Sequence, residues 1–489
     1  MPASALPSLR PAPASPSPAP LASLTSSMTS SLMSRLVSWQ RPGTGRWQRY
    51  GWRFAATALA ASLGLVFAGN ARAQSLQELY EAARAFDATY LAAKSLAASA
   101  EYRVAQTEAL SSPTLAATAA ATLARVDPPT AGMLGSRTGQ AALNGRYPLF
   151  NRANSATIEQ ARRSLDAAKA DLDTAEQDLI VRVAQAYFDV LAAQDALATT
   201  QASKAAITEQ LASAKRNFEV GTATITDTRE AQARFDLATA QEIAAENDLR
   251  AKRIALDQLV GRSSVAPKPL AVPVTLPALA PTNVEQWVTA ADDQHPTIRR
   301  ARIAVDVAQL ETAKARAGEM PTVDAVASVG AIDQRGSAIV PTSRGTTANG
   351  SIGVQLNWPL YTGGATQNRI RETLLLEEKA GNDLQAARRG VAQGTRVAFF
   401  GVQSGQAQVL ALEAAEASSK LALEATQLGY KVGVRVNLDV LNAQTQLFTT
   451  QRDLARARYD VLIGGLKLRQ ASGQLAAGDV EAVNRLLAK

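Results

Sequence analysis

The chain has 489 residues, with no cysteine and a single histidine. The absence of cysteine excludes disulfides, thiolate metal sites, a cysteine nucleophile and a lipid anchor attached through an N-terminal cysteine. A formal net charge of +8 suggests a nucleic-acid binder, but residues 1–73 carry seven arginines and no acidic residue. The remaining residues are almost neutral, so the charge does not support a nucleic-acid partner.

Residues 1–73 have the features of a secretory signal region. Residues 54–68 form an apolar run that is too short to span a bilayer comfortably. The tripeptide that ends at Ala73 has the small-x-small pattern of a cleavage signal. We therefore expect export, with cleavage near Ala73 and with translation starting at Met1, Met28 or Met33. After this region no run of about 20 apolar residues follows, so no transmembrane helix is expected.

The rest of the sequence contains the same pattern twice. Tyr147-Pro-Leu-Phe matches Trp358-Pro-Leu-Tyr, and Phe218-Glu-Val-Gly matches Tyr430-Lys-Val-Gly, at nearly constant spacing. Matches of this kind along the whole chain predict two repeats of one architecture. The predicted units are a first repeat at 74–266, a Pro-rich equatorial linker at 267–283, a second repeat at 284–475 and a C-terminal tail at 476–489.

Each repeat is predicted to contain one long helix and two shorter ones. Small and apolar residues recur every three or four positions from Ile158 to Leu197, which is the pattern of a coiled-coil seam. No proline interrupts 153–218 or 365–430, so each of these helices is expected to be about 100 Å long. The shorter helices are expected at 75–111, 224–260, 284–319 and 436–472, where two placed end to end match one long helix.

Four β-strands are predicted, two in each repeat, at 113–126, 140–150, 321–333 and 348–361. The clearest alternates Ile352, Val354 and Leu356 with small or polar residues. All four have the length of a tilted membrane-spanning strand. The aromatic residues near their helix-side ends are expected at a membrane interface, and they are Tyr147, Phe150, Trp358 and Tyr361.

Four strands of this length do not close a barrel, and open sheet edges cannot face lipid because their N–H and C=O groups have no partner there. Three chains would supply twelve strands and twelve helical rods. The predicted fold class is therefore an α+β membrane protein with internal duplication. A trimer would share a 12-strand barrel, and the long coiled-coil helices would form a periplasmic tunnel.

The stretch 429–443, followed by 452–459, and its first-repeat counterpart 217–227 resemble the TolC family of outer-membrane channel proteins. The resemblance covers essentially all of 74–475. It implies a homotrimeric exit duct in the outer membrane, in contact with outer-membrane lipid. The expected partners are a periplasmic adaptor (membrane fusion protein) and an inner-membrane pump, either an ABC transporter or a proton-driven pump. No cofactor and no nucleic acid are expected.

The cargo is left open by the sequence. The missing anchor cysteine favours type I protein secretion, and multidrug or metal efflux is the alternative. A structural or adhesive trimeric coiled-coil surface protein is a rival of another class, but such proteins carry their strands at the C-terminus, whereas here the strands are internal. An enzyme is not expected, because metalloprotease, hydrolase and nucleotide-binding motifs are absent. His295, which precedes Pro296, is expected to cap a helix.

The turns after the two long helices are the candidate gate. Gly221 and Gly433 are placed for left-handed C-terminal caps. After these turns, Asp227 and Asn437 are placed to begin the next helices, and Asp227 and Glu230 have capping-box spacing. The simpler interpretation is that these residues only shape two helical hairpins.

The family resemblance implies that Tyr430, Arg435, Asp227 and Thr226 form a network that closes the tunnel. An arginine can hold a carboxylate on a neighbouring hairpin through charge-assisted hydrogen bonds. The resemblance also implies acidic rings at the constriction, here at Asp439 and one turn later at Asn442, which departs from the pattern. Weaker binding of polyvalent cations is expected from one ring than from two. Alternatively, Asp439 is only an acid favoured at a helix start.

Overall fold

The computed structural model describes residues 73–127, 129, 132–271, 273–338 and 344–488. The predicted signal region therefore lies outside the described residues, apart from Ala73. Among the described residues, no helix combines the length and the apolar character needed to cross a membrane.

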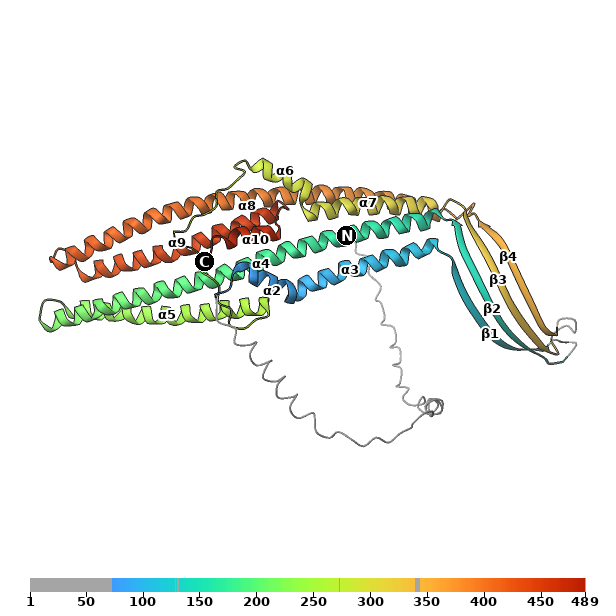
Figure 1. Cartoon of the computed structure of the whole chain (residues 1–489), viewed down its shortest axis with the longest axis horizontal. Coiled ribbons are helices and arrows are strands. Elements are labelled where there is room, and N and C mark those ends of the chain that lie inside the picture. The colour runs from blue at the N-terminus through green and yellow to red at the C-terminus, as the bar shows by residue number, and fades with distance from the viewer. Residues whose placement is uncertain (1–72, 128, 130–131, 272, 339–343, 489) are drawn as a thin grey trace, which may run out of the picture. The chain divides into compact units, whose positions relative to one another are not determined.

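One antiparallel sheet contains four strands in chain order (Figure 1). They are β1 (Thr114–Val126), β2 (Leu134–Phe150), β3 (Thr322–Gly336) and β4 (Gly345–Asn357). Helices join all four strands at the same end of the sheet: α3 leads into β1, α4 follows β2, α7 leads into β3 and α8 follows β4. Strands β1 and β4 are the edges of the sheet.

The helices repeat the lateral order of the strands. Helix α4 packs against α3 and α5 on one side and against α7 and α9 on the other, and α8 packs against α7 and α9. Each position beside a long helix is thus filled by two shorter helices end to end (Figure 1). The helices are α2 (Leu76–Phe86), α3 (Ala88–Glu108), the short 3₁₀ helix η1 (Ala109–Ser111), α4 (Arg152–Glu219), α5 (Ile225–Val260), α6 (Val284–Gln294), α7 (Pro296–Ala317), α8 (Ala365–Lys431), α9 (Asn437–Ala471) and α10 (Ala477–Asn484).

Two of the predicted short helices, 75–111 and 284–319, were wrong as single helices. Asp87 ends α2 and caps α3, and its carboxylate accepts hydrogen bonds from the Tyr90 N–H (2.8 Å) and from Arg182. His295 caps α7 through Nδ1, which accepts from the Thr297 N–H at 3.2 Å, so its expected capping role is confirmed. Each of these helix breaks, at Asp87 and at His295, occupies a single residue. The apolar periodicity therefore continues across the break, and the sequence pattern does not reveal it.

The strand limits also differ from the prediction. Strand β2 begins at Leu134, because it pairs with β1 along the whole of that strand despite its loop-like glycines. Strand β3 extends to Gly336. The predicted strand 348–361 is β4, which begins at Gly345 and stops at Asn357. Trp358 and Tyr361 therefore lie beyond the strand.

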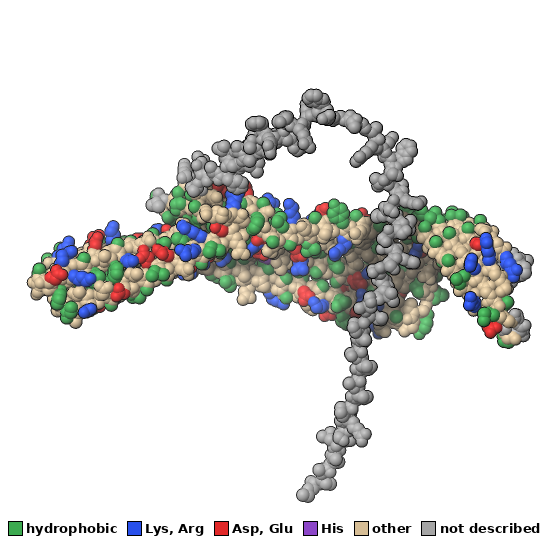
Figure 2. Space-filling model, turned by 90° about the horizontal axis from the view of Figure 1, so that it is seen from below, with side chains coloured by type: hydrophobic (Ala, Val, Ile, Leu, Met, Phe, Trp, Pro, Cys, Tyr) green, Lys and Arg blue, Asp and Glu red, His purple; other side chains and the backbone are tan. Residues whose placement is uncertain are grey.

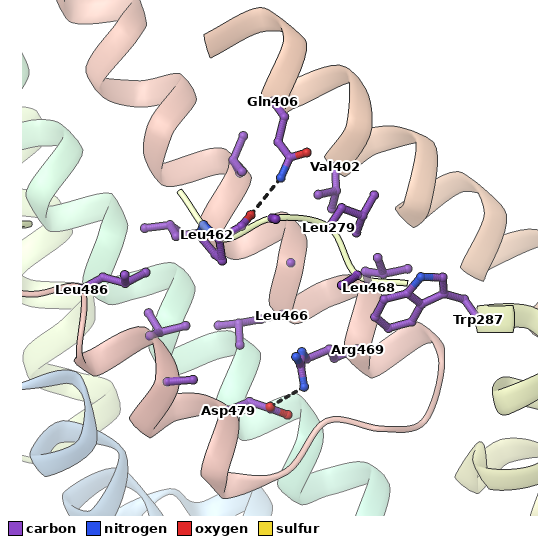
Figure 3. A pocket seen from close by; sticks show the side chains of 17 residues that line it. Leu279, Trp287, Val402, Gln406, Leu462, Leu466, Leu468, Arg469, Asp479 and Leu486 are labelled. Atoms are coloured by element: carbon purple, nitrogen blue, oxygen red, sulfur yellow. Dashed lines mark hydrogen bonds and ion pairs between the residues drawn. The ribbon is translucent and has the colours of Figure 1, made fainter. Parts of the chain in front are cut away.

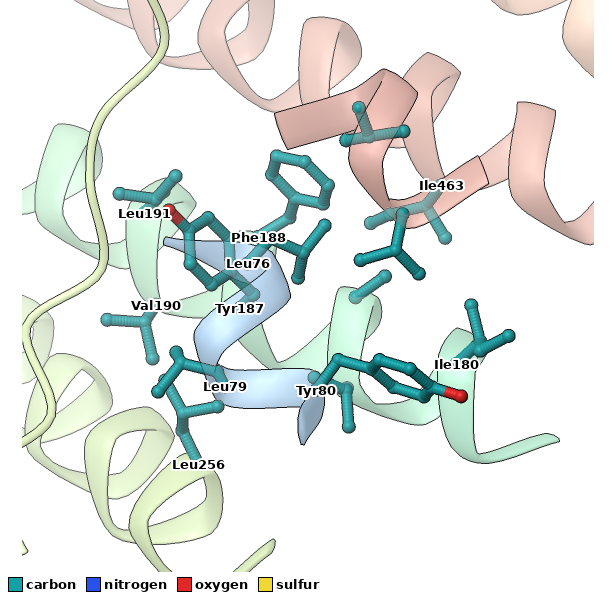
Figure 4. Close-up of a cluster of buried hydrophobic side chains, with 14 of the residues drawn as sticks. Leu76, Leu79, Tyr80, Ile180, Tyr187, Phe188, Val190, Leu191, Leu256 and Ile463 are labelled. Carbon is teal, nitrogen blue, oxygen red and sulfur yellow. The ribbon is translucent and has the colours of Figure 1, made fainter. Parts of the chain in front are cut away.

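The C-terminal segment is more than a tail. Helix α10 places Val480 and Val483 in the main apolar cluster, and Leu487 forms a β-bridge with Leu270 of the Pro-rich segment. The cluster lies where α2, α4, α5 and α9 meet (Figure 4). Its largest fully buried side chains include Tyr187 and Phe188 of α4. The Tyr187 hydroxyl donates to the Lys268 carbonyl at 2.8 Å, which fastens the Pro-rich segment to the core.

The two faces of the sheet differ in chemistry. Residues directly opposite each other in the strand register point to the same face, so the register assigns each side chain. One face, which we call the apolar face, carries exposed apolar side chains. They are Leu115, Leu123, Leu143, Tyr147, Val329, Ile352, Val354 and Leu356. The polar face carries Thr118, Asn144, Arg146, Asp324, Ser328 and Ser351, and on it Arg146 pairs with the buried Asp324 at 2.6 Å.

A cavity of about 170 Å³ lies between the Pro-rich segment and helices α8, α9 and α10 (Figure 3). Its walls are mainly apolar and include Leu279, Val402, Leu462, Leu466 and Val483. The polar side chains that reach it already have partners within the chain: Arg469 pairs with Asp479 at 2.6 Å, and the Gln406 amide donates to the Pro277 carbonyl at 3.0 Å. These two contacts hold the Pro-rich segment and α10 against the second hairpin.

Candidate functional site: the hairpin tips and the contacts of α9

Two helical hairpins, α4–α5 and α8–α9, end in turns of the same geometry. Gly221 and Gly433 have φ angles of 77° and 80°, the left-handed region that favours glycine. The carbonyl of Asn217 accepts the Thr222 N–H at 2.8 Å, and the carbonyl of Gly429 accepts the Val434 N–H at the same distance. The duplication therefore extends to the backbone hydrogen bonds of the tips.

The helices that follow these turns begin differently from the prediction. Thr224 caps α5, and Asp227 is the acidic partner of its capping box, with Oδ2 accepting from the Thr224 N–H at 3.0 Å. Asn437 is the first residue of α9, after Val436. Its buried amide oxygen accepts from Gln210 Nε2 at 2.5 Å instead of capping its own helix.

The four residues of the predicted gate network have other partners within one chain. Arg435 pairs with Asp439 of its own hairpin at 3.5 Å. The Tyr430 hydroxyl accepts from Asn217 Nδ2 of the other hairpin at 3.2 Å. Thr226 shares a hydrogen bond with the Thr224 hydroxyl. Among the described residues, no hydrogen bond or ion pair joins Asp227 to Tyr430 or Arg435, and the network stays a prediction.

The two predicted ring positions also differ from each other. Asp439 lies in the first turn of α9, where its carboxylate faces Arg435. Asn442, one turn later, accepts a hydrogen bond from the Arg234 guanidinium of α5 at 3.0 Å. Within one chain, the neutral residue at the second position thus links the two hairpins.

Helix α9 is joined to the first repeat by polar contacts along most of its length. Near the tip, an apolar cluster around Leu441 of α9 includes Ile207 and Leu211 of α4 and Ala231 of α5. Above it, the Tyr459 hydroxyl donates to Asp195 at 2.6 Å. Among the described residues, the hydrogen bonds between the α8–α9 hairpin and the first repeat are Asn217–Tyr430, Gln210–Asn437, Arg234–Asn442, Asp195–Tyr459, Gln185–Lys467 and Asp178–Gln470, and all but the first involve α9.

Sequence reasoning missed the first-repeat members of this set. Gln210 and Arg234 belong to no motif, and Asn217 begins the stretch 217–227 but was given no role of its own. The partner of each lies more than 200 residues away. The available signal was a break in the internal repeat, because Asn217 stands where the second repeat has Gly429.

The four predicted interface aromatics are all exposed. Tyr147 and Phe150 belong to β2, and Tyr147 points to the apolar face. Trp358 and Tyr361 lie in the connection from β4 to α8, and the Trp358 indole donates to the Glu319 carbonyl at 3.2 Å. All four lie near the end of the sheet that joins the helices.

Comparison with known proteins agrees with this layout. The family model described as "Outer membrane efflux protein" matches residues 79–262 and 287–474, which correspond to the two repeats. The chain belongs to the outer membrane efflux protein family. The predicted TolC-family membership is confirmed.

Two relatives and one solved structure illustrate this membership. The chain is 34% identical to outer membrane protein TolC of Vibrio cholerae over 344 residues, covering 70% of this chain and 78% of that protein. It is 36% identical to alkaline protease secretion protein AprF of Pseudomonas aeruginosa over 309 residues, covering 63% of this chain and 64% of AprF. The structure of VceC from Vibrio cholerae has the same fold, with a TM-score of 0.69 and 22% identity over 81% of this chain and 96% of VceC.

This efflux-family protein is therefore an outer-membrane exit duct whose helical part lies in the periplasm. The family is one of transport ducts and not of enzymes. The end of the sheet that joins the helices is then the periplasmic end, and the opposite end faces outward.

One contact of α9 in this efflux-family duct joins two side chains whose pKa values are shifted by burial. Burial raises the pKa of Asp195 above its ordinary value of 3.8, and the hydrogen bond from the Tyr459 hydroxyl opposes part of that shift. Burial, together with the neighbouring Asp195, also raises the pKa of Tyr459. The nearby Arg458 is paired with Glu413 at 2.8 Å. The carboxyl of Asp195 is therefore less readily ionised in the folded chain than in the unfolded chain.

We expect Asp195→Asn to stabilise the protein at pH 7. As pH rises from 3.8, the unfolded chain releases this proton first, so the free energy of unfolding falls until the folded carboxyl has also ionised. Asparagine keeps the hydrogen bond from Tyr459 and cannot titrate. The midpoint of thermal denaturation should therefore exceed that of the wild type by a few degrees at pH 7 and differ little at pH 4.

Tyr459→Phe is the matched control. This substitution removes the hydroxyl that donates to the ionised Asp195 carboxylate. The free energy of unfolding should therefore fall more steeply with rising pH than in the wild type. Identical pH profiles for the wild type and Asp195→Asn would contradict the assigned role of Asp195.

Proposed function

We propose that three copies of the chain assemble side by side into one exit duct. Strands β1 and β4 are both 13 residues long, and each has a neighbour on one side only within a chain. An unpaired strand edge is not tolerated in lipid, whereas pairing β4 of one copy with β1 of the next satisfies both edges. The match in strand length supports this pairing.

The helical edges support the same arrangement. Thr395, Val402 and Val409 of α8 are buried at a spacing of seven residues and form a coiled-coil seam within the chain. Leu410, Leu421 and Leu428 lie on another side of α8 and are exposed. Exposed apolar side chains also mark the opposite edge, at Leu91, Leu96 and Tyr102 of α3 and at Leu237, Ile243 and Ile254 of α5. Contact between these two edges in neighbouring copies would bury both.

We expect Leu410→Asp to prevent or weaken assembly, because it places a charge in this contact. Gln408→Asp introduces the same charge two residues away on α8, at an exposed polar position, and should leave the trimer intact. Native mass spectrometry of protein extracted from the outer membrane distinguishes three chains from one. Equal effects of the two substitutions would argue against the proposed edge contact.

The gate is proposed to close where α9 approaches the tunnel axis in such a trimer. Asp439 would then supply one ring of three carboxylates. Asn442 supplies none, and its amide is engaged by Arg234. We expect trivalent cations to block this duct more weakly than a duct with two acidic rings.

We expect Arg234→Ala/Asn442→Asp to be blocked by trivalent cations at concentrations several-fold lower than the wild type requires. Asn442→Asp alone should change the block less, because Arg234 would neutralise the new carboxylate. Arg234→Ala alone is the control for loss of the positive charge. Single-channel recordings in planar bilayers give the blocking concentration for each variant, and equal values for all of them would rule out Asn442 as a ring position.

The proposed cargo is protein, delivered by an ABC transporter and a periplasmic adaptor in a type I system. The relative AprF, which is named an alkaline protease secretion protein, is 36% identical to the chain and supports a protein cargo. The observation that supports the duct itself is the four-strand sheet continued by four helical rods in the same order. Multidrug or metal efflux is the competing assignment within the same architecture.

Deleting the gene in the native bacterium separates these assignments. We expect specific proteins to disappear from the culture medium and to return when the wild-type chain is supplied. Unchanged secreted proteins with increased sensitivity to drugs or divalent metals would favour efflux. Loss of surface adhesion alone, without a transport defect, would favour a structural role.

A further inference from the structure

The apolar face of the sheet ends in a row of arginines on the side away from the helices. Arg137 of β2 lies directly opposite Arg335 of β3 and also opposite Leu123 of β1. Arg125 follows Leu123 by two residues and so points to the same face. Figure 2 shows basic side chains gathered near this end of the sheet. The row therefore continues the apolar face and not the polar one.

The charges in this row are poorly balanced within the chain. Arg335 pairs with Asp333 at 3.0 Å, and its side chain remains 72% exposed. Asp127 follows the last residue of β1, and among the described residues no ion pair joins it to an arginine of this row. No hydrogen bond or ion pair to Arg125 or Arg137 is formed by side chains in the described part of the chain. Like charges directly opposite each other on a sheet are destabilising, so Arg137 and Arg335 favour an anion between them.

The height of the row places it at a membrane surface. Tyr147 and Arg137 lie on the same face of β2, ten residues apart, or about 33 Å along the strand. A strand tilted by about 40° converts this length into about 25 Å, the height of the apolar band of outer-membrane strands. With Tyr147 at the periplasmic interface, Arg137 reaches the head groups of the outer leaflet.

We propose that Arg125, Arg137 and Arg335 form a binding site for the phosphate groups of phosphorylated glycolipid in the outer leaflet. The site rests on the proposed assembly, in which the apolar face is the outer, lipid-facing side of the closed sheet. Guanidinium groups form paired, charge-assisted hydrogen bonds with phosphate oxygens. A phosphate bridging Arg137 and Arg335 also relieves their mutual repulsion, and Asp333 orients Arg335 toward it.

The test compares lipid retention in two double variants. Arg137→Gln/Arg335→Gln removes the opposed pair at exposed positions, so folding is preserved. Arg456→Gln/Arg485→Gln removes the same charge from exposed positions in the periplasmic part, on α9 and at the end of α10. Each protein is extracted in mild detergent, and native mass spectrometry counts the lipopolysaccharide molecules bound per trimer. We expect several-fold lower retention in the first variant and wild-type retention in the second, with Arg137→Lys/Arg335→Lys intermediate because lysine retains the charge but not the paired geometry.

The source of the phosphate is tested by reconstitution into phosphatidylethanolamine vesicles, with lipopolysaccharide or with phosphatidylglycerol added. Lipopolysaccharide should raise the thermal midpoint of the wild type more than that of Arg137→Gln/Arg335→Gln, and phosphatidylglycerol should not discriminate between them. Equal retention by all variants, or an equal effect of the two lipids, would overturn the proposal. If trimers form but bind no lipopolysaccharide, the lipid site is wrong and the proposed assembly stands. If no trimers form, the proposed assembly itself is wrong.

Discussion

Unpaired backbone groups at the two edges of the sheet are the constraint on which the rest of the structure depends. The sheet has a lipid-compatible face, but β1 and β4 each leave one side of the strand without hydrogen-bond partners. Water can satisfy those groups, whereas hydrocarbon cannot. Because each strand continues into one helical rod, the same edges recur in the periplasmic part, as α3 and α5 on one side and α8 on the other. The exposed apolar side chains of α3, α5 and α8 thus continue the two unpaired edges of the sheet along the helical part of the chain.

Much of this fold was predictable because the signals are local. Alternation around Ile352 and Val354 identified β4. The seven-residue pattern identified the first long helix, and the absence of proline together with the internal repeat identified the second. The errors arise where a short polar feature interrupts a long pattern. Asp87 and His295 each end one helix and start the next within a single residue, which a window of several turns does not detect. The C-terminal helix α10 was missed because its packing depends on elements distant in sequence.

The candidate site was predictable only in its backbone. Glycine at the two tips predicts the left-handed turns, because few other residues adopt that conformation without strain. The side-chain partners of Tyr430, Asn437 and Asn442 were not predictable. These partners come close only when the second hairpin packs against α4 and α5. Long polar side chains near a helix end have many possible partners, and the sequence alone does not rank them.

The internal duplication places the same backbone turn at the tips of both hairpins, where the side chains make different contacts. In the first repeat, the tip position holds Asn217, whose amide reaches Tyr430 of the other hairpin. In the second repeat, the same position is Gly429, where a Cβ atom would lie 2.8 Å from Arg435 Cγ. Glycine therefore leaves room for the Arg435 side chain to fold back over the turn from which it reaches Asp439. The two turns thus share one backbone geometry but differ in the side chain at this position: Asn217 contacts the other hairpin, whereas Gly429 has no side chain. The donor Asn217 stands where the second repeat has Gly429, and its acceptor Tyr430 stands where the first repeat has Phe218. These two differences make the repeated hairpins complementary.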